Sequence, residues 1–356
     1  MKNKMKKIAI NGALLMGEIT GIERYAREIL NIIDEICEKG LFILVVPKSA
    51  NNIPQYKNIE VKYYGRFKGT LWIQTNYFYY VIRHSLIPFS FDAIVPFFKP
   101  GIATIHDISF KVNHDFFNDG IKGYLAILFR EIFYKRCTKK CSMIFTVSNY
   151  SKKEICKHYS YDADKIIVTG NGWNHIEKIT PNYQLRIEHP EWFYKPFFYS
   201  LSSIAKNKNI KWIIETAKLN PEYSFLIAGG IQKHSSNVLE NLENVKNIIL
   251  CGRVSDADSK YLMEQCEAFL FPSLYEGFGI PPLEALACGA KIIISNTTCL
   301  PEIYRNSASY IDPYTPCSNL KQLLNKEVNT DKEVIQHYTW RNMALIVYNH
   351  LIENLN

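Results

Sequence analysis

The stretch "AFLFPSLYEGFGIPPLEALACGAKIIISN", residues 268–296, has the order strand, loop, helix, strand. "AFLFPS" and "AKIIISN" are apolar runs of strand length, and "LEALA" continues a helix between them. Pro281 or Pro282 suits the first turn of that helix, and Gly289 suits its end. Two strands joined through a helix predict a parallel pair in an α/β sheet.

The same alternation extends through the rest of the chain. The first half offers strand candidates in "KIAING" (7–12), "LFILVVP" (41–47), "DAIVPF" (92–97), "GIATIHD" (101–107) and "SMIFTVS" (142–148). The second half adds "PFFYSLSSI" (196–204), "YSFLIAGG" (223–230) and "NIILCG" (247–252). Helical patterns lie between them, so the sequence predicts two Rossmann-like, doubly wound α/β domains. Ligands of such sheets bind beyond the carboxyl ends of the strands, which places the expected site between the two domains.

Breaks in this pattern suggest the domain boundaries. We expect an N-terminal domain over residues 1–175, a linker over 176–192, and a second domain over 193–335. The linker is polar, contains Pro181 and Pro190, and lacks a clear periodicity. Residues 336–356 include "YTWRNMALIVYNHLIENL", which predicts one amphipathic helix.

Composition narrows the class of protein. The formal charge of +8 comes from Lys and Arg spread along 356 residues, and no motif for reading nucleic acid accompanies them. Nine scattered Cys indicate reduced thiols and a cytoplasmic setting. The basic and apolar start is interrupted by Asn11 and Gly12, which favours a first strand over a signal peptide. No apolar run approaches the roughly 18 residues of a membrane span.

The loop between strand and helix carries the chemistry. Gly277 and Gly279 allow a tight turn and close approach to a ligand. Backbone N–H groups at a helix start suit a phosphate. Glu276 lies in the loop and Glu284 in the helix, so both carboxylates are expected at one pocket mouth, where they can accept bonds from sugar hydroxyls.

Here the chain resembles a known family. "FPSLYEGFGIPPLEALACGAKIIISNTTCLPEIY" is similar to the E-x7-E signature of retaining family-4 (group 1) glycosyltransferases of the GT-B fold, of the bacterial polysaccharide mannosyl- and rhamnosyltransferase type. Further segments extend the resemblance over nearly the whole chain: "TGIERYAREI", "TIHDISF", "TVSNYSKKEI", "CGRVSDADSKYLMEQCEAFLFPS" and "YTWRNMALIVYNHL". In the family the last helix crosses back to the first domain.

The resemblance implies roles for particular residues. Glu276 lies by the donor sugar and Glu284 binds the ribose hydroxyls. His106 faces the donor sugar; without the resemblance, a structural histidine at a strand end would be the favoured interpretation. The other donor-binding candidates are the backbone of Gly277, Phe278, Gly279 and Ile280, the nucleobase neighbours Arg253 and Val254, and Gly17 and Gly21 in the first loop.

One motif departs from the family. Many relatives have Arg-Lys-Asn where this chain reads Asn207, Lys208 and Asn209. Lys208 is then the expected catalytic cation that neutralises the leaving diphosphate, and Lys206 a second charge nearby. Neither forms the bidentate fork of Arg, so the departure bears on the strength of phosphate neutralisation.

No cofactor or metal is expected, because the nucleotide-sugar is a substrate. Two Asp-Ala-Asp triplets, Asp162–Asp164 and Asp256–Asp258, resemble metal-binding D-x-D motifs. Both lie where helices or strands begin, so capping and turn formation explain them better.

The resemblance implies a metal-independent hexosyltransferase that builds a surface polysaccharide such as lipopolysaccharide or capsule. Its donor would be a GDP-, UDP- or dTDP-sugar and its acceptor a glycan or lipid-linked glycan. "IKGYLAILFREIFYKRCTKK" (121–140) is either a packed helix with a solvated basic end or a surface that contacts anionic lipid at the inner face of the membrane. A nucleotide-sugar binder without transfer activity and a GT-B sugar-nucleotide epimerase remain as alternatives.

Overall fold

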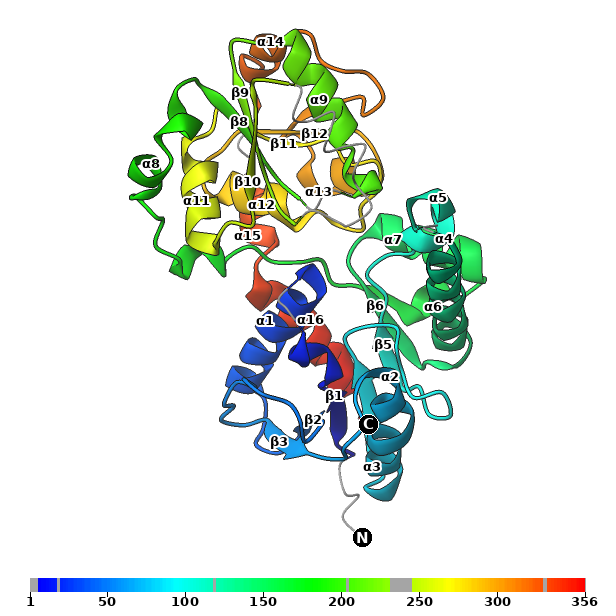
Figure 1. Ribbon diagram of the computed structural model, residues 1–356. Helices are drawn as coiled ribbons and strands as arrows, with labels where there is room; N and C mark the ends of the chain where they lie inside the picture. Colours follow the sequence, from blue (N-terminus) through cyan, green and yellow to red (C-terminus); the bar gives the residue numbers. More distant parts are fainter. Residues whose placement is uncertain are drawn as a thin grey trace. The chain divides into compact units, whose positions relative to one another are not determined.

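The computed structural model describes residues 6–17, 20–117, 120–202, 205–230, 245–328 and 332–355 (Figure 1). The chain forms two compact units. Unit 1 contains residues 1–172 together with 340–356, and unit 2 contains residues 173–339. Each is described below by itself.

Unit 1 is built on a parallel sheet. Over the described residues its seven strands lie in the order β3-β2-β1-β4-β5-β6-β7. They are β1 (Ile8–Asn11), β2 (Phe42–Val46), β3 (Glu60–Tyr63), β4 (Ile87–Ser90), β5 (Ile102–Thr104), β6 (Met143–Thr146) and β7 (Ile166–Val168). The inner strands are buried on both faces, as helices covering a parallel sheet require. The strand order reverses between β1 and β4, which marks the carboxyl edge there as the natural ligand position.

Helix α1 (Gly21–Ile36) follows β1 and begins with a capping box between Thr20 and Glu23. The last helix, α16 (Trp340–Glu353), packs directly on α1 within unit 1 (Figure 1). Gly172, where the chain leaves unit 1, lies so close to Trp340 that a Cβ there would come within 2.3 Å of its backbone nitrogen. The other helical segments are η1 (Ala13–Met16), α2 (Gly69–Trp72), η2 (Ile73–Tyr77), α3 (Phe78–Arg83), α4 (Ser109–Val112), α5 (His114–Phe117), α6 (Gly120–Lys140), α7 (Asn149–Tyr159) and η3 (Ala163–Lys165).

Unit 2 repeats the architecture with six described strands in the order β10-β9-β8-β11-β12-β13. They are β8 (Phe197–Leu201), β9 (Ser224–Ala228), β10 (Ile248–Gly252), β11 (Ala268–Phe271), β12 (Ile292–Ser295) and β13 (Ser309–Ile311). The described helical segments are η4 (Ile176–Lys178), α8 (Leu185–Glu188), η5 (Pro190–Phe193), η6 (Lys206–Lys208), α9 (Ile210–Leu219), α11 (Asp256–Gln265), α12 (Ile280–Ala287), α13 (Leu300–Tyr304), α14 (Leu320–Leu324) and α15 (Lys332–His337).

The predicted fold class is confirmed, since both units are parallel α/β sheets of Rossmann type. One predicted strand is wrong: residues 92–97, "DAIVPF", form turns and irregular backbone. The strand lies just before, at β4, which pairs with β1 although it contains Pro88. Proline cannot donate a hydrogen bond to a neighbouring strand, so sequence reasoning passes over such a segment.

The expected linker has a different structure. Residues 176–192 carry η4, α8 and most of η5 and belong to unit 2. The chain passes between the units at Gly172 and again at Thr339, so α15 stays in unit 2 and α16 begins unit 1 anew. Helices as short as those around Pro181 and Pro190 produce no long periodicity, so the sequence pattern indicates a linker there.

Candidate functional site

The loop from β11 to α12 has a tightly constrained backbone. Gly279 has φ of +85°, and a Cβ added there would lie 3.0 Å from Leu300 and 3.3 Å from Phe271. The hydroxyl of the fully buried Tyr304 donates a hydrogen bond to the Gly279 carbonyl. Any side chain at this position would be strained, and the bond from Tyr304 helps to hold the turn in one conformation.

The N–H groups available for a phosphate come from the loop more than from the helix. Helix α12 starts at Ile280, and its next two residues are Pro281 and Pro282, which have no N–H. The general expectation of a helix N-terminal anion site is therefore weakened here. The backbone donors that remain belong to the Gly277–Ile280 turn.

Glu276 and Lys208 form an ion pair at the start of this loop. Lys208 Nζ lies 2.6 Å from Glu276 Oε1, and the side chains are only 21% and 12% exposed. The Glu276 carbonyl accepts a hydrogen bond from the Cys299 thiol. Burial, and next the Glu276 carboxylate, raise the pKa of Cys299, which therefore stays protonated and donates. The structure thus brings together the two expected catalytic residues of unit 2.

The turn that carries Lys208 is joined to the loop by backbone and amide bonds. Leu274 N donates to the carbonyl of Asn207 at 2.8 Å. Asn209 adopts a left-handed conformation, and its Nδ2 donates to Pro272 O at 3.1 Å and to Pro313 O at 2.7 Å. Asn207 uses its main chain in this junction. Lys206, at the start of the turn, is exposed.

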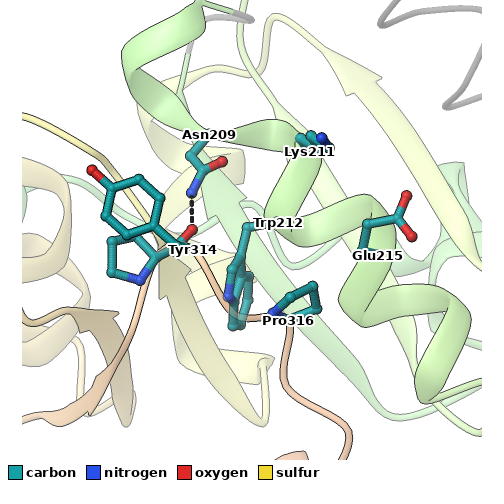
Figure 2. A pocket seen from close by; sticks show the side chains of 7 residues that line it. Asn209, Lys211, Trp212, Glu215, Tyr314 and Pro316 are labelled. Atoms are coloured by element: carbon teal, nitrogen blue, oxygen red, sulfur yellow. Dashed lines mark hydrogen bonds between the residues drawn. The ribbon is translucent and has the colours of Figure 1, made fainter.

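A hollow of about 150 Å³ lies next to Asn209, the last residue of this turn (Figure 2). Its lining comes from the start of α9 and the loop after β13: Asn209, Lys211, Trp212, Glu215, Pro313, Tyr314 and Pro316. Trp212 Nε1 donates to Thr315 O at 2.8 Å, and Asn209 spans to Pro313. These bonds join the start of α9, which follows the Lys208 turn, to the loop after β13.

Glu284 is held by a residue that sequence reasoning missed. His175 Nε2 lies 2.8 Å from Glu284 Oε1, and the side chains are 6% and 11% exposed. The two residues are more than a hundred positions apart in the chain. A lone histidine in "GNGWNHI" carries no spacing signal toward the E-x7-E helix, so no pattern in the sequence identifies it.

The other predicted site residues of unit 2 differ in how far they are buried. Arg253 is exposed and Val254 half-buried just after β10. The Phe278 side chain is buried and makes an edge-on contact with Tyr338, with the ring centroids 5.2 Å apart, so the side chain is not available to a ligand. Ile280 is the half-buried first residue of α12.

In unit 1, His106 lies just beyond β5 at the carboxyl edge of the sheet. Its Nε2 is 2.9 Å from the Phe91 carbonyl. A carbonyl only accepts, so Nε2 carries the proton and Nδ1 of a neutral ring is the acceptor. Burial lowers the pKa of His106, which favours that neutral form.

The two candidate glycines of the first loop lie before and at the start of α1. Gly17 is exposed, with only ordinary van der Waals distances around a built Cβ, and Gly21 is the first residue of α1. The residue that needs to be glycine is Gly12, where a Cβ would lie 2.4 Å from Val46 Cγ1 and 2.7 Å from Val45 O.

Both Asp-Ala-Asp triplets act as caps, as predicted. Asp162 caps η3 by accepting a bond from Asp164 N. Ser255 and Asp258 form the capping box of α11. Throughout the described ranges, no cluster of three or more His, Cys, Asp or Glu is arranged to hold a metal. Among the helices that the structure describes, none combines the length and apolar character needed to cross a bilayer.

Comparison with known proteins gives matches to both units. The model of Glycosyltransferase Family 4 matches residues 20–175, and the model of Glycosyl transferases group 1 matches residues 188–332. The chain belongs to the GT-B glycosyltransferases of group 1. The predicted recognition and enzyme class are thereby confirmed.

Individual relatives agree with this family. The chain is 25% identical to O-antigen chain mannosyltransferase RfbU of Salmonella typhimurium, with 92% of each chain covered. It is 26% identical to N,N'-diacetylbacillosaminyl-diphospho-undecaprenol alpha-1,3-N-acetylgalactosaminyltransferase of Campylobacter jejuni, over 59% of this chain and 57% of that one. Among solved structures, Anabaena Alr3699/HepE in complex with UDP and glucose aligns with a TM-score of 0.70 at 14% identity, covering 97% and 99% of the two chains.

Proposed function

We propose that this glycosyltransferase transfers a hexosyl group, with retention of configuration and without a metal, from a nucleotide-sugar to a lipid-linked glycan in surface polysaccharide synthesis. The observation that carries the proposal is the Lys208–Glu276 pair at 2.6 Å, beside the fixed Gly277–Ile280 turn. It joins a cation suited to a diphosphate with a carboxylate suited to sugar hydroxyls.

The charges fit the bond that breaks. As the sugar leaves, negative charge grows on the diphosphate, and Lys208 together with the loop N–H groups stabilises it. The exposed Lys206 supplies a weaker, screened contribution. Glu284 accepts bonds from the ribose hydroxyls. His106 of unit 1, neutral and with Nδ1 as acceptor, contacts a hydroxyl of the donor sugar.

Retention follows if the acceptor hydroxyl attacks from the side that the diphosphate leaves. The departing phosphate oxygen then takes the proton of that hydroxyl, so no protein base is required for this step. The product anomer, read by NMR, tests it: the donor's anomeric configuration supports retention, and the opposite one contradicts it.

GDP-mannose is the first donor to test, because RfbU is described as a mannosyltransferase. UDP-glucose is the second, because the HepE structure contains UDP and glucose. The acceptor class is supported by the Campylobacter relative, whose name includes a diphospho-undecaprenol-linked sugar.

Helix α6 supports contact of unit 1 with a membrane surface. Six exposed apolar side chains recur at helical spacing on one face: Ile121, Tyr124, Leu125, Leu128, Phe129 and Ile132. They extend over about 16 Å of helix. Lys139 continues the same face toward the C-terminal end, next to Lys140, and both are exposed. An apolar stripe that ends in lysines is complementary to an anionic bilayer surface, where a polyprenyl-linked acceptor resides.

Vesicle binding tests the membrane contact. We expect the protein to sediment with vesicles containing phosphatidylglycerol at low salt, and less with pure phosphatidylcholine. Leu125→Glu and Leu128→Glu together should abolish binding. Ile187→Glu, which charges an exposed apolar residue of unit 2, is the matched control and should not. If both variants bound the vesicles equally well, the proposed membrane contact of α6 would be wrong.

Release of nucleoside diphosphate tests the transfer reaction. With EDTA, a nucleotide-sugar and a membrane extract containing lipid-linked glycans, we expect nucleoside diphosphate to be released as sugar enters the lipid fraction. A binder without transfer activity is stabilised by the nucleotide but releases none. A requirement for Mg²⁺ would contradict the metal-independent mechanism.

A further inference from the structure

We propose that His175 is a positioning residue for the donor: it orients the Glu284 carboxylate toward the ribose and thereby sets how strongly the site distinguishes nucleotides by their sugar hydroxyls. This inference rests on the proposed role of Glu284 in ribose binding. It adds a residue, outside the E-x7-E stretch, on which that role depends.

The first observation is the contact itself. The 2.8 Å distance between His175 Nε2 and Glu284 Oε1 is that of a hydrogen bond in which Nε2–H donates. Both side chains are nearly buried, so the carboxylate is largely withdrawn from water. A withdrawn carboxylate needs a donor nearby, and His175 is one.

The second observation is that the chain around His175 is anchored on both sides. Before it, the buried Trp173 donates through Nε1 to Ile335 O at 2.8 Å. After it, Lys260 donates to Ile176 O at 3.1 Å and to Ile179 O at 2.9 Å. Helices α11 and α15 thus fix the segment on either side of the imidazole, and α12 contacts both helices.

Other ionisable groups near the Glu284 carboxylate show why the hydrogen bond from His175 matters. Tyr199, Tyr304 and Cys288 each have a pKa raised first by burial and further by the Glu284 charge. These acids stay protonated and bring no positive charge to Glu284. An ionised carboxylate offers about four acceptor positions, so one bond from His175 fixes its direction and leaves capacity for ribose hydroxyls.

Nucleotides that differ only in the ribose test the inference. The dissociation constants of GDP and UDP would be measured by calorimetry, each against its 2′,3′-dideoxy analogue. For the wild type we expect the ribose form of the preferred base to bind at least about tenfold more tightly, because it alone can bond to a charged carboxylate. In His175→Leu this ratio should fall toward one, whereas affinity for the dideoxy form should hardly change.

Conservative replacement separates positioning from folding. In His175→Gln the amide nitrogen can take the place of Nε2, so most of the ratio should return. If His175→Leu fails to fold, His175→Asn replaces it, because its shorter side chain withdraws the nitrogen from Oε1. A loss in His175→Leu that His175→Gln does not restore would indicate a structural role and overturn the proposal.

Glu284→Gln separates the inference from the function beneath it. If Glu284→Gln loses the ratio and His175→Leu keeps it, Glu284 binds ribose without help from His175, and the inference is wrong. If Glu284→Gln keeps the wild-type ratio, or no nucleotide binds, the proposed role of Glu284 fails and the inference fails with it.

Discussion

The carboxyl edges of the two sheets differ in chemistry although the sheets share one architecture. In unit 2 the edge carries ionisable side chains in close contact, Lys208 with Glu276 and His175 with Glu284. In unit 1 the edge carries groups whose charged forms are disfavoured by burial: His106, whose pKa is lowered, and Asp92, whose pKa is raised to about 7. The charged edge of unit 2 suits the diphosphate of the proposed donor, whereas the edge of unit 1 offers a hydrogen-bond acceptor that is uncharged when His106 is neutral. Function therefore follows from the residues at the edge and not from the fold.

The largest expected effect is at the charged edge. Lys208→Met removes the cation that we propose stabilises the leaving diphosphate, and it leaves the Glu276 carboxylate without this partner. We expect kcat for nucleoside diphosphate release to fall about 10²–10³-fold, as for loss of one preorganised donor to a developing anion. Lys206→Met, which removes an exposed charge two residues away, is the control and should cost less than about tenfold. Equal losses of kcat in the two variants would show that Lys208 contributes no more to the reaction than an exposed lysine does.

The second effect distinguishes the cost of a left-handed backbone from the cost of crowding in the loop between β11 and α12. Gly279 and Gly289 share φ of +85°, but a Cβ at Gly289 meets nothing within 4 Å. Gly289→Ala should cost about 1–2 kcal/mol of unfolding free energy from the left-handed backbone alone. Gly279→Ala should cost about a further 1 kcal/mol or more through its contacts. Chemical denaturation measures both, and only Gly279→Ala should also lose nucleotide binding.

The third effect concerns the edge of the sheet in unit 1. Burial raises the pKa of Asp92 to about 7 from 3.8, so folding favours its protonated form. The stability it contributes is complete below about pH 4 and is lost as the pH rises through 7. Relative to Asp92→Asn, the wild type should therefore lose unfolding free energy between pH 4 and pH 7. If the unfolding free energies of the two proteins changed with pH in the same way across this range, the pKa of Asp92 would not be raised by folding.

The smallest effect is a gain. Asn207 holds the loop through its carbonyl, so its side chain can be exchanged without losing the bond from Leu274 N. Asn207→Arg should raise the affinity for a nucleoside diphosphate about threefold to tenfold by adding a charged, bidentate donor. Asn207→Gln, which adds length but no charge, should leave it unchanged. No gain with Arg would mean that Lys208 already satisfies the diphosphate.

Much of the fold could be predicted because periodicity and turn residues are local properties. Strands such as β11 and helix α12 follow directly from apolar runs, Pro281 and Gly289. β4 could not, because Pro88 argues against a central strand and only pairing with β1 on one side and β5 on the other overrides it. β3, β7 and β13 are short and lack the long apolar runs that marked most of the other strands.

The candidate site could be predicted only as far as the motif extends. Glu276, Gly279 and Glu284 lie in one stretch, and Lys208 aligned with a known motif. The roles of His175, Tyr304 and Gly12 arise from contacts between segments distant in the sequence. Such contacts depend on tertiary packing, which no local pattern encodes.

Thermal denaturation with nucleoside diphosphates tests the central claim most directly. The wild type would be heated in EDTA with GDP, UDP, dTDP or CDP, and Glu284→Gln alongside it. We predict that one base raises the melting temperature of the wild type, since a ligand at about 100 times its Kd adds roughly 2.7 kcal/mol. The gain should be much smaller in Glu284→Gln. If none of the four stabilises the folded wild type, or if stabilisation requires Mg²⁺, the metal-independent donor site in unit 2 is contradicted.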